Sequence, residues 1–188
     1  MSAVQLEGGF AHLSHDAAHA FRAALQTMAR PGRIETLALA RPPAPCSPAA
    51  GALILALCDT TTPIHLAPSH EDAGLRAWIA FHTGAPLVAP EDAMFALGTW
   101  GALCPVDRFA IGTSAYPDRA ATLIVEMDAL EAKGTVLHGP GIKGRAALSL
   151  PEVAAFQDNR RRFPLGFDCY FTSGDRLAGL PRSTHVEG

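Results

Sequence analysis

Four polar residues near the start of the chain have the spacing of a helical site: His15, Asp16, His19 and Arg22. Histidines four residues apart share one helix face, as in the zinc-binding helix of metalloproteases. Asp16 stands in place of the central glutamate, however, and no third ligand follows, so we predict no metal site. Asp16, His19 and Arg22 are each three residues apart, so they can touch in a line and form a contact surface. The alternative is an ordinary polar outer face.

A second group of polar side chains can bind an anion near the other end of the chain. Arg182, Thr184 and His185 lie close together, and each can donate a hydrogen bond to an anionic oxygen. The arginine run at residues 160–162 ends a predicted helix, where positive charge complements the helix dipole. Docking of a phosphate-rich ligand or acidic partner is the functional alternative for that run. A solvated polar tail is the alternative for residues 182–185.

Two further polar residues follow predicted helices. His82 ends one helix, where a capping role competes with a catalytic one. Asp59 comes directly after an apolar helix and can cap the turn that follows. Both remain candidate ligand or partner contacts.

The run GPGIKG at residues 139–144 matches the dinucleotide-binding fingerprint letter for letter. That fingerprint needs a strand that leads into the N-terminus of a helix. Here residues 145–150 look extended, so we predict a tight turn between two strands. No Gly-x-Ser-x-Gly and no paired Cys/His nucleophile pattern is present, and the lysines Lys133 and Lys143 lie near glycine-rich turns.

The composition limits the classes of protein to which the chain can belong. The chain has 188 residues, 48% of them apolar, which fits one globular domain over residues 1–188. The formal charge of −3 gives no basis for nucleic-acid binding. No stretch is long and apolar enough to span a membrane, and residues 1–9 do not resemble a secretory signal. The four cysteines are widely spaced, as expected for reduced thiols. We expect a cytoplasmic protein.

The elements that must position these residues follow from apolar periodicity and turn signals. Helices are predicted at residues 14–30, 47–58, 69–81, 99–109 with a break at Pro105, and from a capping box at 149–152 to 162. Strands are predicted at residues 34–39, 62–67, 86–88, 93–97, 121–127, 135–138, 146–150, 167–172 and 176–180. Helices and strands alternate early and strands follow one another late. This order predicts an α/β fold, a three-layer arrangement with a mixed sheet and helices on both faces.

Several blocks of sequence, in order along nearly the whole chain, resemble one known family. They cover residues 16–22 (DxxHxFR), 28–32 (MxxPG), 59–63 (DxxTP), 81–88 (FHTxxPLV), 139–142 (GxGI), 163–168 (FPLGxD) and 181–187 (PRxTHVE). Single blocks are weak, but the ordered set is specific. The chain is identified as a member of the PhnH family, the H subunit of the carbon–phosphorus lyase core complex. His15 and the arginine run are not family features.

The resemblance implies a fold similar to the large domain of type I pyridoxal-phosphate transferases, without the cofactor. It also implies a homodimer that joins the G, I and J subunits in one complex. That complex attaches a phosphonate to ribose triphosphate before the carbon–phosphorus bond is cleaved. Because neither lysine is well placed for a Schiff base, we expect no cofactor.

Two functions remain open at this point. The first is an accessory, structural subunit of the complex, which the lack of a nucleophile, metal or cofactor motif favours. The second is an active subunit that binds a phosphorylated nucleotide or sugar through Arg22, His82, Arg182 and His185.

Overall fold

The centre of the molecule is a six-stranded mixed sheet with the strand order β1-β8-β7-β4-β3-β2. The computed structural model describes residues 6–187. Strands β2 (Ile64–Leu66), β3 (Phe95–Thr99), β4 (Thr122–Glu126) and β7 (Asp168–Ser173) are parallel neighbours, and β8 (Arg176–Leu180) and β1 (Ile34–Thr36) add antiparallel pairs. The apolar run at residues 121–127 forms the central part of this sheet, as predicted.

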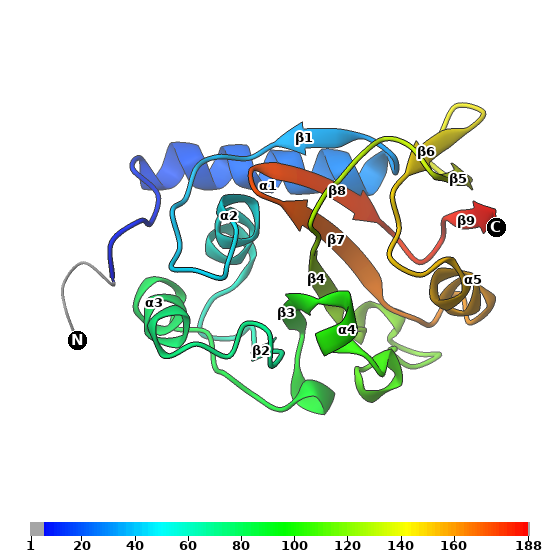
Figure 1. The fold of residues 1–188 in the computed structure, drawn as a ribbon. Helices are drawn as coiled ribbons and strands as arrows, with labels where there is room; N and C mark the ends of the chain where they lie inside the picture. Colours follow the sequence, from blue (N-terminus) through cyan, green and yellow to red (C-terminus); the bar gives the residue numbers. More distant parts are fainter. Residues whose placement is uncertain (1–5, 188) are drawn as a thin grey trace.

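Three helices cover one face of the sheet: α1 (Leu13–Ala29), α2 (Pro48–Leu57) and α3 (Ala73–Thr83). Figure 1 shows α2 between α1 and α3. From β4, Ile124 points into this core. Helix α2 begins as predicted, because Ser47 caps it through a 3.2 Å hydrogen bond from the Ala50 N–H, and Pro48 occupies its first turn.

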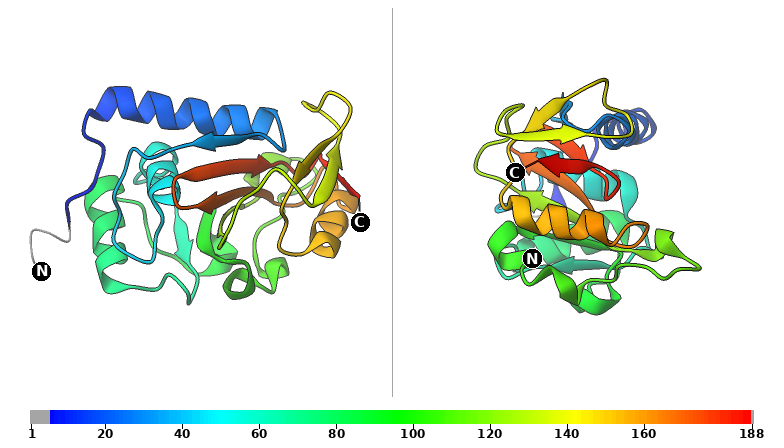
Figure 2. Two further views of the ribbon diagram at one scale, coloured as in Figure 1. Left: turned by 45° about the horizontal axis from the view of Figure 1, so that its top comes forward. Right: turned by 90° about the vertical axis from the view of Figure 1, so that its right-hand side faces the viewer.

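The opposite face of the sheet is covered by α4 (Trp100–Leu103), α5 (Val153–Arg161) and a small three-stranded sheet. Because side chains alternate along a strand, Leu123 and Val125 enter this second core while Ile124 enters the first. Figure 2 shows the hairpin of the small sheet next to the C-terminal end of α1. The predicted mixed α/β sheet with helices on both faces is therefore confirmed.

The small sheet has the order β6-β5-β9, formed by β5 (Thr135–His138), β6 (Ala146–Leu148) and β9 (His185–Glu187). Strands β5 and β6 form an antiparallel pair around the 139–144 turn, so the predicted tight turn is confirmed and the dinucleotide fingerprint is excluded. A solvated polar tail was one of the two interpretations of residues 182–185. In fact β9 pairs with β5, because the chain returns along the free edge of that strand. Gly188 lies outside the described residues.

Three helix starts differ from the prediction. Helix α1 has its N-cap at His12, before the predicted start at residue 14. Helix α3 has its N-cap at Asp72, which accepts from two backbone N–H groups, after the predicted start at residue 69. Helix α5 begins after Glu152. Ser149 does not cap it, because its hydroxyl accepts from the Glu131 N–H instead. At α5, the tertiary contact of Ser149 thus decides against the predicted cap.

Two other segments are less regular than predicted. Residues 99–109 form the short helix α4 and a 3-10 turn, Val106–Arg108, because Pro105 interrupts the helix. Residues 86–88 contribute one bridge, Leu87 to Ile64, and no strand of their own. None of the helices in the described range is long and apolar enough to cross a membrane.

Candidate functional site

The predicted line of Asp16, His19 and Arg22 does not form. Asp16 is buried and accepts a 2.9 Å hydrogen bond from the His12 N–H, with the His15 ring 3.3 Å away. The backbone bond from His12 is the main reason that the pKa of Asp16 lies below its usual value. Asp16 therefore stabilises the first turn of α1. His19 and Arg22 stay exposed and line one hollow of about 500 Å³ with His15 and Ala18.

Apolar periodicity predicts that Phe21 and Leu25 belong to the inward face of α1, but both face outward. Their side chains are 53% and 54% exposed, and Leu13 in the first turn is 73% exposed. The buried side of the helix consists of Asp16, Ala20, Ala23, Ala24 and Thr27. The helix packs closely against β8, since a Cβ added to Gly179 would lie 2.8 Å from the Met28 nitrogen. The space between helix and strand admits small side chains only, so the large ones face outward.

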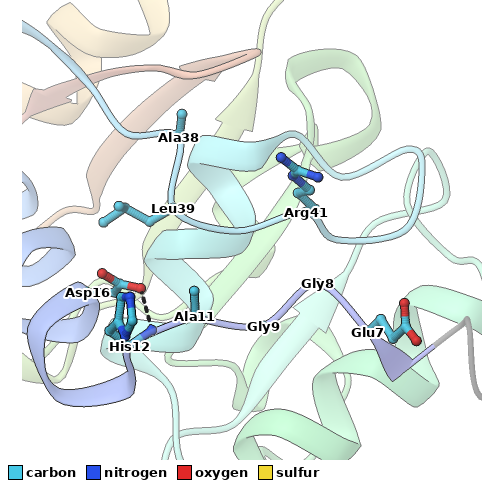
Figure 3. Close-up of a pocket in the computed structure, with 9 residues that line it drawn as sticks. All are labelled: Glu7, Gly8, Gly9, Ala11, His12, Asp16, Ala38, Leu39 and Arg41. Atoms are coloured by element: carbon cyan, nitrogen blue, oxygen red, sulfur yellow. Dashed lines mark hydrogen bonds between the residues drawn. The ribbon is translucent and has the colours of Figure 1, made fainter.

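A separate hollow of about 690 Å³ lies between the N-terminal segment and the loop before α2. Figure 3 shows its lining, with Asp16 and His12 at one end, Glu7 at the other and Arg41 above. The segment is held from both sides: the Arg41 N–H donates to the Gly8 carbonyl and the Trp78 indole N–H donates to the Glu7 carbonyl. The hollow therefore has a carboxylate near each end and one guanidinium above them.

His82 lies in the last turn of α3 and contacts this same segment. Its Nε2 lies 2.9 Å from the Leu6 carbonyl oxygen, and its ring is 4.9 Å from the Trp78 ring. The helix itself ends at Gly84, whose left-handed φ of +67° suits the C-cap. His82 thus fastens the N-terminal segment, a contact that no local sequence signal indicated.

Asp59 caps the turn after α2, which was one of the two roles predicted for it. Its Oδ1 accepts hydrogen bonds of 2.8 Å from the Thr61 N–H, the Thr61 hydroxyl and the Thr62 hydroxyl. These bonds, the Thr61 hydroxyl first, lower the pKa of Asp59. Asp59 therefore stabilises this turn through one of its two carboxylate oxygens.

The C-terminal donors occupy different environments. Arg182 forms a two-pronged pair with Asp168, at 3.1 Å from Nε to Oδ1 and 2.6 Å from Nη2 to Oδ2, and donates to the Pro117 carbonyl at 2.8 Å. Thr184 is buried, and its hydroxyl has no hydrogen-bond partner among residues 6–187. His185 stacks on His138 with ring centres 4.7 Å apart.

His185 also accepts from an arginine of the run at residues 160–162. Its Nε2 lies 3.1 Å from Arg160 Nη2, so the ring nitrogen accepts and the imidazole is neutral there. Desolvation, then the charge of Arg160 and the neighbouring His138, lower the pKa of His185. Arg161 pairs with Asp158 within α5. Arg160 and Arg161 therefore support the small sheet and the helix end, and Arg162 stays exposed.

The eight predicted site residues do not converge on one place. His19 and Arg22 share a hollow on α1, and Arg182, Thr184 and His185 follow one another before and into β9. His82 belongs to α3, which Figure 1 places on the opposite side of the molecule from the C-terminus. A single ligand site that uses Arg22, His82, Arg182 and His185 together is not formed in this structure.

Sequence reasoning missed a buried polar centre at the carboxyl ends of the parallel strands. Glu126 ends β4 and accepts from the Ser47 N–H at 2.7 Å and from the Thr172 hydroxyl at 2.9 Å. His70 follows β2, is 3% exposed, and places Nε2 3.9 Å from Glu126 Oε1. Burial raises the pKa of Glu126 and lowers that of His70. The rule that ligands bind at this edge of open α/β sheets could have drawn attention to it.

In this structure the polar centre serves to join parts of the fold. Through Ser47, Glu126 connects the central strand to the cap of α2, and through Thr172 to β7. Cys46 beside it is buried, and burial raises its pKa well above the usual value. No group of three or more His, Cys, Asp or Glu side chains within residues 6–187 is arranged to hold a metal ion.

These features define a mixed α/β protein whose polar groups largely stabilise its own fold and whose longest helix exposes large apolar side chains. A family model described as bacterial phosphonate metabolism protein (PhnH) matches residues 8–187. The chain is 42% identical, over 96% of its length and 94% of the relative's, to a Rhizobium meliloti protein named alpha-D-ribose 1-methylphosphonate 5-triphosphate synthase subunit PhnH. The chain therefore belongs to the PhnH family.

A second relative is more distant. It is a Stutzerimonas stutzeri protein named as a candidate C-P lyase subunit, HtxG, and it is 27% identical over 89% of this chain and 84% of its own. Both names describe subunits.

Proposed function

We propose that this chain is the H subunit of a carbon–phosphorus lyase core complex, the alpha-D-ribose 1-methylphosphonate 5-triphosphate synthase, and that its role there is accessory. The observation that carries the proposal is the 42% identity to a protein of that name over nearly all of both chains. The second relative, named as a subunit of the same kind of machinery, supports it. The complex would serve phosphonate use in the cytoplasm.

The geometry favours the accessory role over the active one. Asp16, Asp59 and Arg182 direct their hydrogen bonds to neighbouring residues of this chain. The four residues of the active-subunit hypothesis lie on separate elements. An active subunit that binds a phosphorylated nucleotide or sugar remains the second candidate, since His19 and Arg22 line an open hollow.

The proposed assembly comprises a homodimer of this chain together with the G, I and J subunits. The proposed unit of folding is one domain over the whole chain, similar to the large domain of type I pyridoxal-phosphate transferases but without the cofactor. In support of the last point, Lys133 pairs with Glu131 at the surface and Lys143 is exposed in a turn. Pyridoxal phosphate mixed with the pure chain should give no saturable visible absorbance band.

The test is co-expression of this chain with the G, I and J subunits, with the affinity tag on the I subunit. We expect the chain to co-purify in a fixed ratio, and the complex to lose its activity when the chain is omitted. The isolated chain should neither consume ATP with methylphosphonate nor bind an ATP analogue. Turnover or saturable analogue binding by the isolated chain would contradict the accessory role and favour the active one.

A further inference from the structure

We propose that the outer surface of α1 is a docking surface for a different protein chain, whose contact face is apolar and rimmed by carboxylates. We define the α1 ridge as Phe21 and Leu25, and the α1 basic flank as His15, His19, Arg22 and Arg30. This inference rests on the proposed function, because it locates a neighbouring subunit on this chain. Figure 2 shows α1 along the outside of the molecule, with β1 and β8 on its inner side.

On α1 the small apolar side chains face the core and the large ones face outward, which is the opposite of the usual arrangement. A surface helix normally turns its large apolar residues inward. Here the buried apolar positions are Ala20, Ala23 and Ala24, whereas Phe21 and Leu25, one turn apart, are more than half exposed. Paired apolar residues at this spacing are the usual anchors of a helix that enters an apolar groove. The ridge is thus suited to burial by another chain.

The charge beside the ridge indicates the chemistry of that chain. His15, His19, Arg22 and Arg30 are all exposed, and the single acidic residue of α1, Asp16, is buried. Arg30 bonds to Gln26 at 2.6 Å, and within residues 6–187 no carboxylate pairs with Arg22. Two hollows, of about 500 and 290 Å³, lie along this flank and both include His19 and Arg22. The smaller one is also lined by Arg33 and Glu35, which pair with each other, so among the described residues the other cations there have no carboxylate partner. Asp or Glu side chains of a partner can enter the two hollows and pair with the cations.

The same charges disfavour a second copy of this chain as the occupant. The α1 of a second copy would offer no exposed carboxylate to Arg22 or Arg30. In an antiparallel twofold pair, the two basic flanks would lie side by side, and like charges close together oppose association. A partner of different sequence is therefore the better match.

The experiment compares two surface variants with matched controls in the co-expressed complex. The ridge variant is Phe21→Ser with Leu25→Ser, and the flank variant is Arg22→Glu. The controls are Met94→Ser and Arg162→Glu, exposed residues on other parts of the surface. Each chain is measured for co-purification with a tagged I subunit, for oligomeric state alone by light scattering, and for melting temperature.

We expect the ridge variant to reduce the recovered chain at least tenfold and the flank variant several-fold, with added salt weakening the wild-type contact. Oligomeric state and melting temperature should stay unchanged, as should all properties of the controls. Undiminished recovery of both variants would overturn the inference. So would loss of self-association, which would make the ridge a contact between copies, or ridge-dependent binding of the pure chain to phosphatidylserine vesicles. If wild-type chain is not recovered, the proposed function itself fails.

Discussion

Arg182 illustrates how a side chain equipped to bind an anionic ligand can have its donors used within the protein. Its guanidinium and Asp168 form two parallel hydrogen bonds, and a further donor reaches the Pro117 carbonyl. The side chain is 12% exposed. The pair therefore joins the start of β7 to the segment that leads into β9, and leaves little of Arg182 for a ligand.

We expect Arg182→Met to lower the free energy of unfolding by about 2–4 kcal/mol, because it leaves a partly buried carboxylate without its partner. Urea unfolding followed by circular dichroism measures this loss. Arg162→Met is the control, since Arg162 is exposed and should change stability by about 0.5 kcal/mol or less. If the Arg182→Met protein has normal stability, the pair with Asp168 does not stabilise the fold. The Arg182 guanidinium is then available to bind an anion.

The burial of His70 predicts how the stability of the protein changes with pH. Burial lowers its pKa in the folded protein below the ordinary value of 6.5. The unfolded chain then binds a proton more readily, so the stability contributed by neutral His70 is present above pH 6.5 and is lost as the pH falls toward the folded-state pKa. We expect His70→Gln to lose less stability than wild type between pH 7.5 and 5.5 (values chosen to bracket about 6.5). Urea titrations at several pH values give the slope of the unfolding free energy against pH for each protein. Equal slopes for wild type and His70→Gln would contradict the lowered pKa of His70.

At the scale of elements, the 139–144 turn does more than connect β5 and β6. Gly141 has a φ of +80°, and an added Cβ would lie 1.9 Å from the Ala29 carbonyl oxygen at the end of α1. Gly144 has the same φ of +80° and open space around it. The turn is thus pressed against α1 at one glycine and free at the other.

This contrast gives a matched pair of variants. Gly144→Ala should cost about 1–2 kcal/mol, the usual penalty of a left-handed conformation with a side chain. Gly141→Ala should cost more, about 3 kcal/mol or above, because the backbone of α1 must also move. Thermal melts of the two proteins give the comparison. Equal destabilisation would show that the turn does not pack against α1.

How far the sequence predicted the structure depends on how local each signal is. Ser47-Pro48 and the hairpin at residues 167–180 were predicted correctly, because their signals lie within a few residues. The mixed sheet with helices on both faces also followed from the alternation of elements. The exposure of Phe21 and Leu25 could not be predicted, since it depends on how closely β8 approaches α1.

The polar centre and the site candidates show the same limit. Glu126 and His70 follow different strands and meet only when β2 and β4 are placed in one sheet. Arg182 was recognised as a donor, but its partner Asp168 becomes its neighbour through the pairing of β7 with β8. The sequence shows which residues can donate or accept hydrogen bonds, but it does not show which residues they pair with in the fold.

At the scale of the whole molecule, one sheet separates two cores, and each core holds one of the two tryptophans. Trp78, on α3, is fully buried in the first core. Trp100 packs on Phe156 of the second core, with ring centres 5.0 Å apart. Because both cores share β4 and its neighbours, we expect them to unfold together. Single-tryptophan proteins, Trp100→Phe and Trp78→Phe, should show fluorescence transitions that coincide with the circular dichroism transition of the same variant. A mismatch would indicate two folding units.

The burial of the cysteines has a practical consequence for such measurements. Cys46, Cys58 and Cys169 are enclosed in the cores, and burial raises the pKa of the Cys58 thiol to about 12. Cys104, at the end of α4, is partly accessible. A maleimide dye should therefore attach to native protein at one position, across the sheet from α1. The wild-type chain can thus carry a single fluorophore that reports on assembly from a distance, with no cysteine engineering.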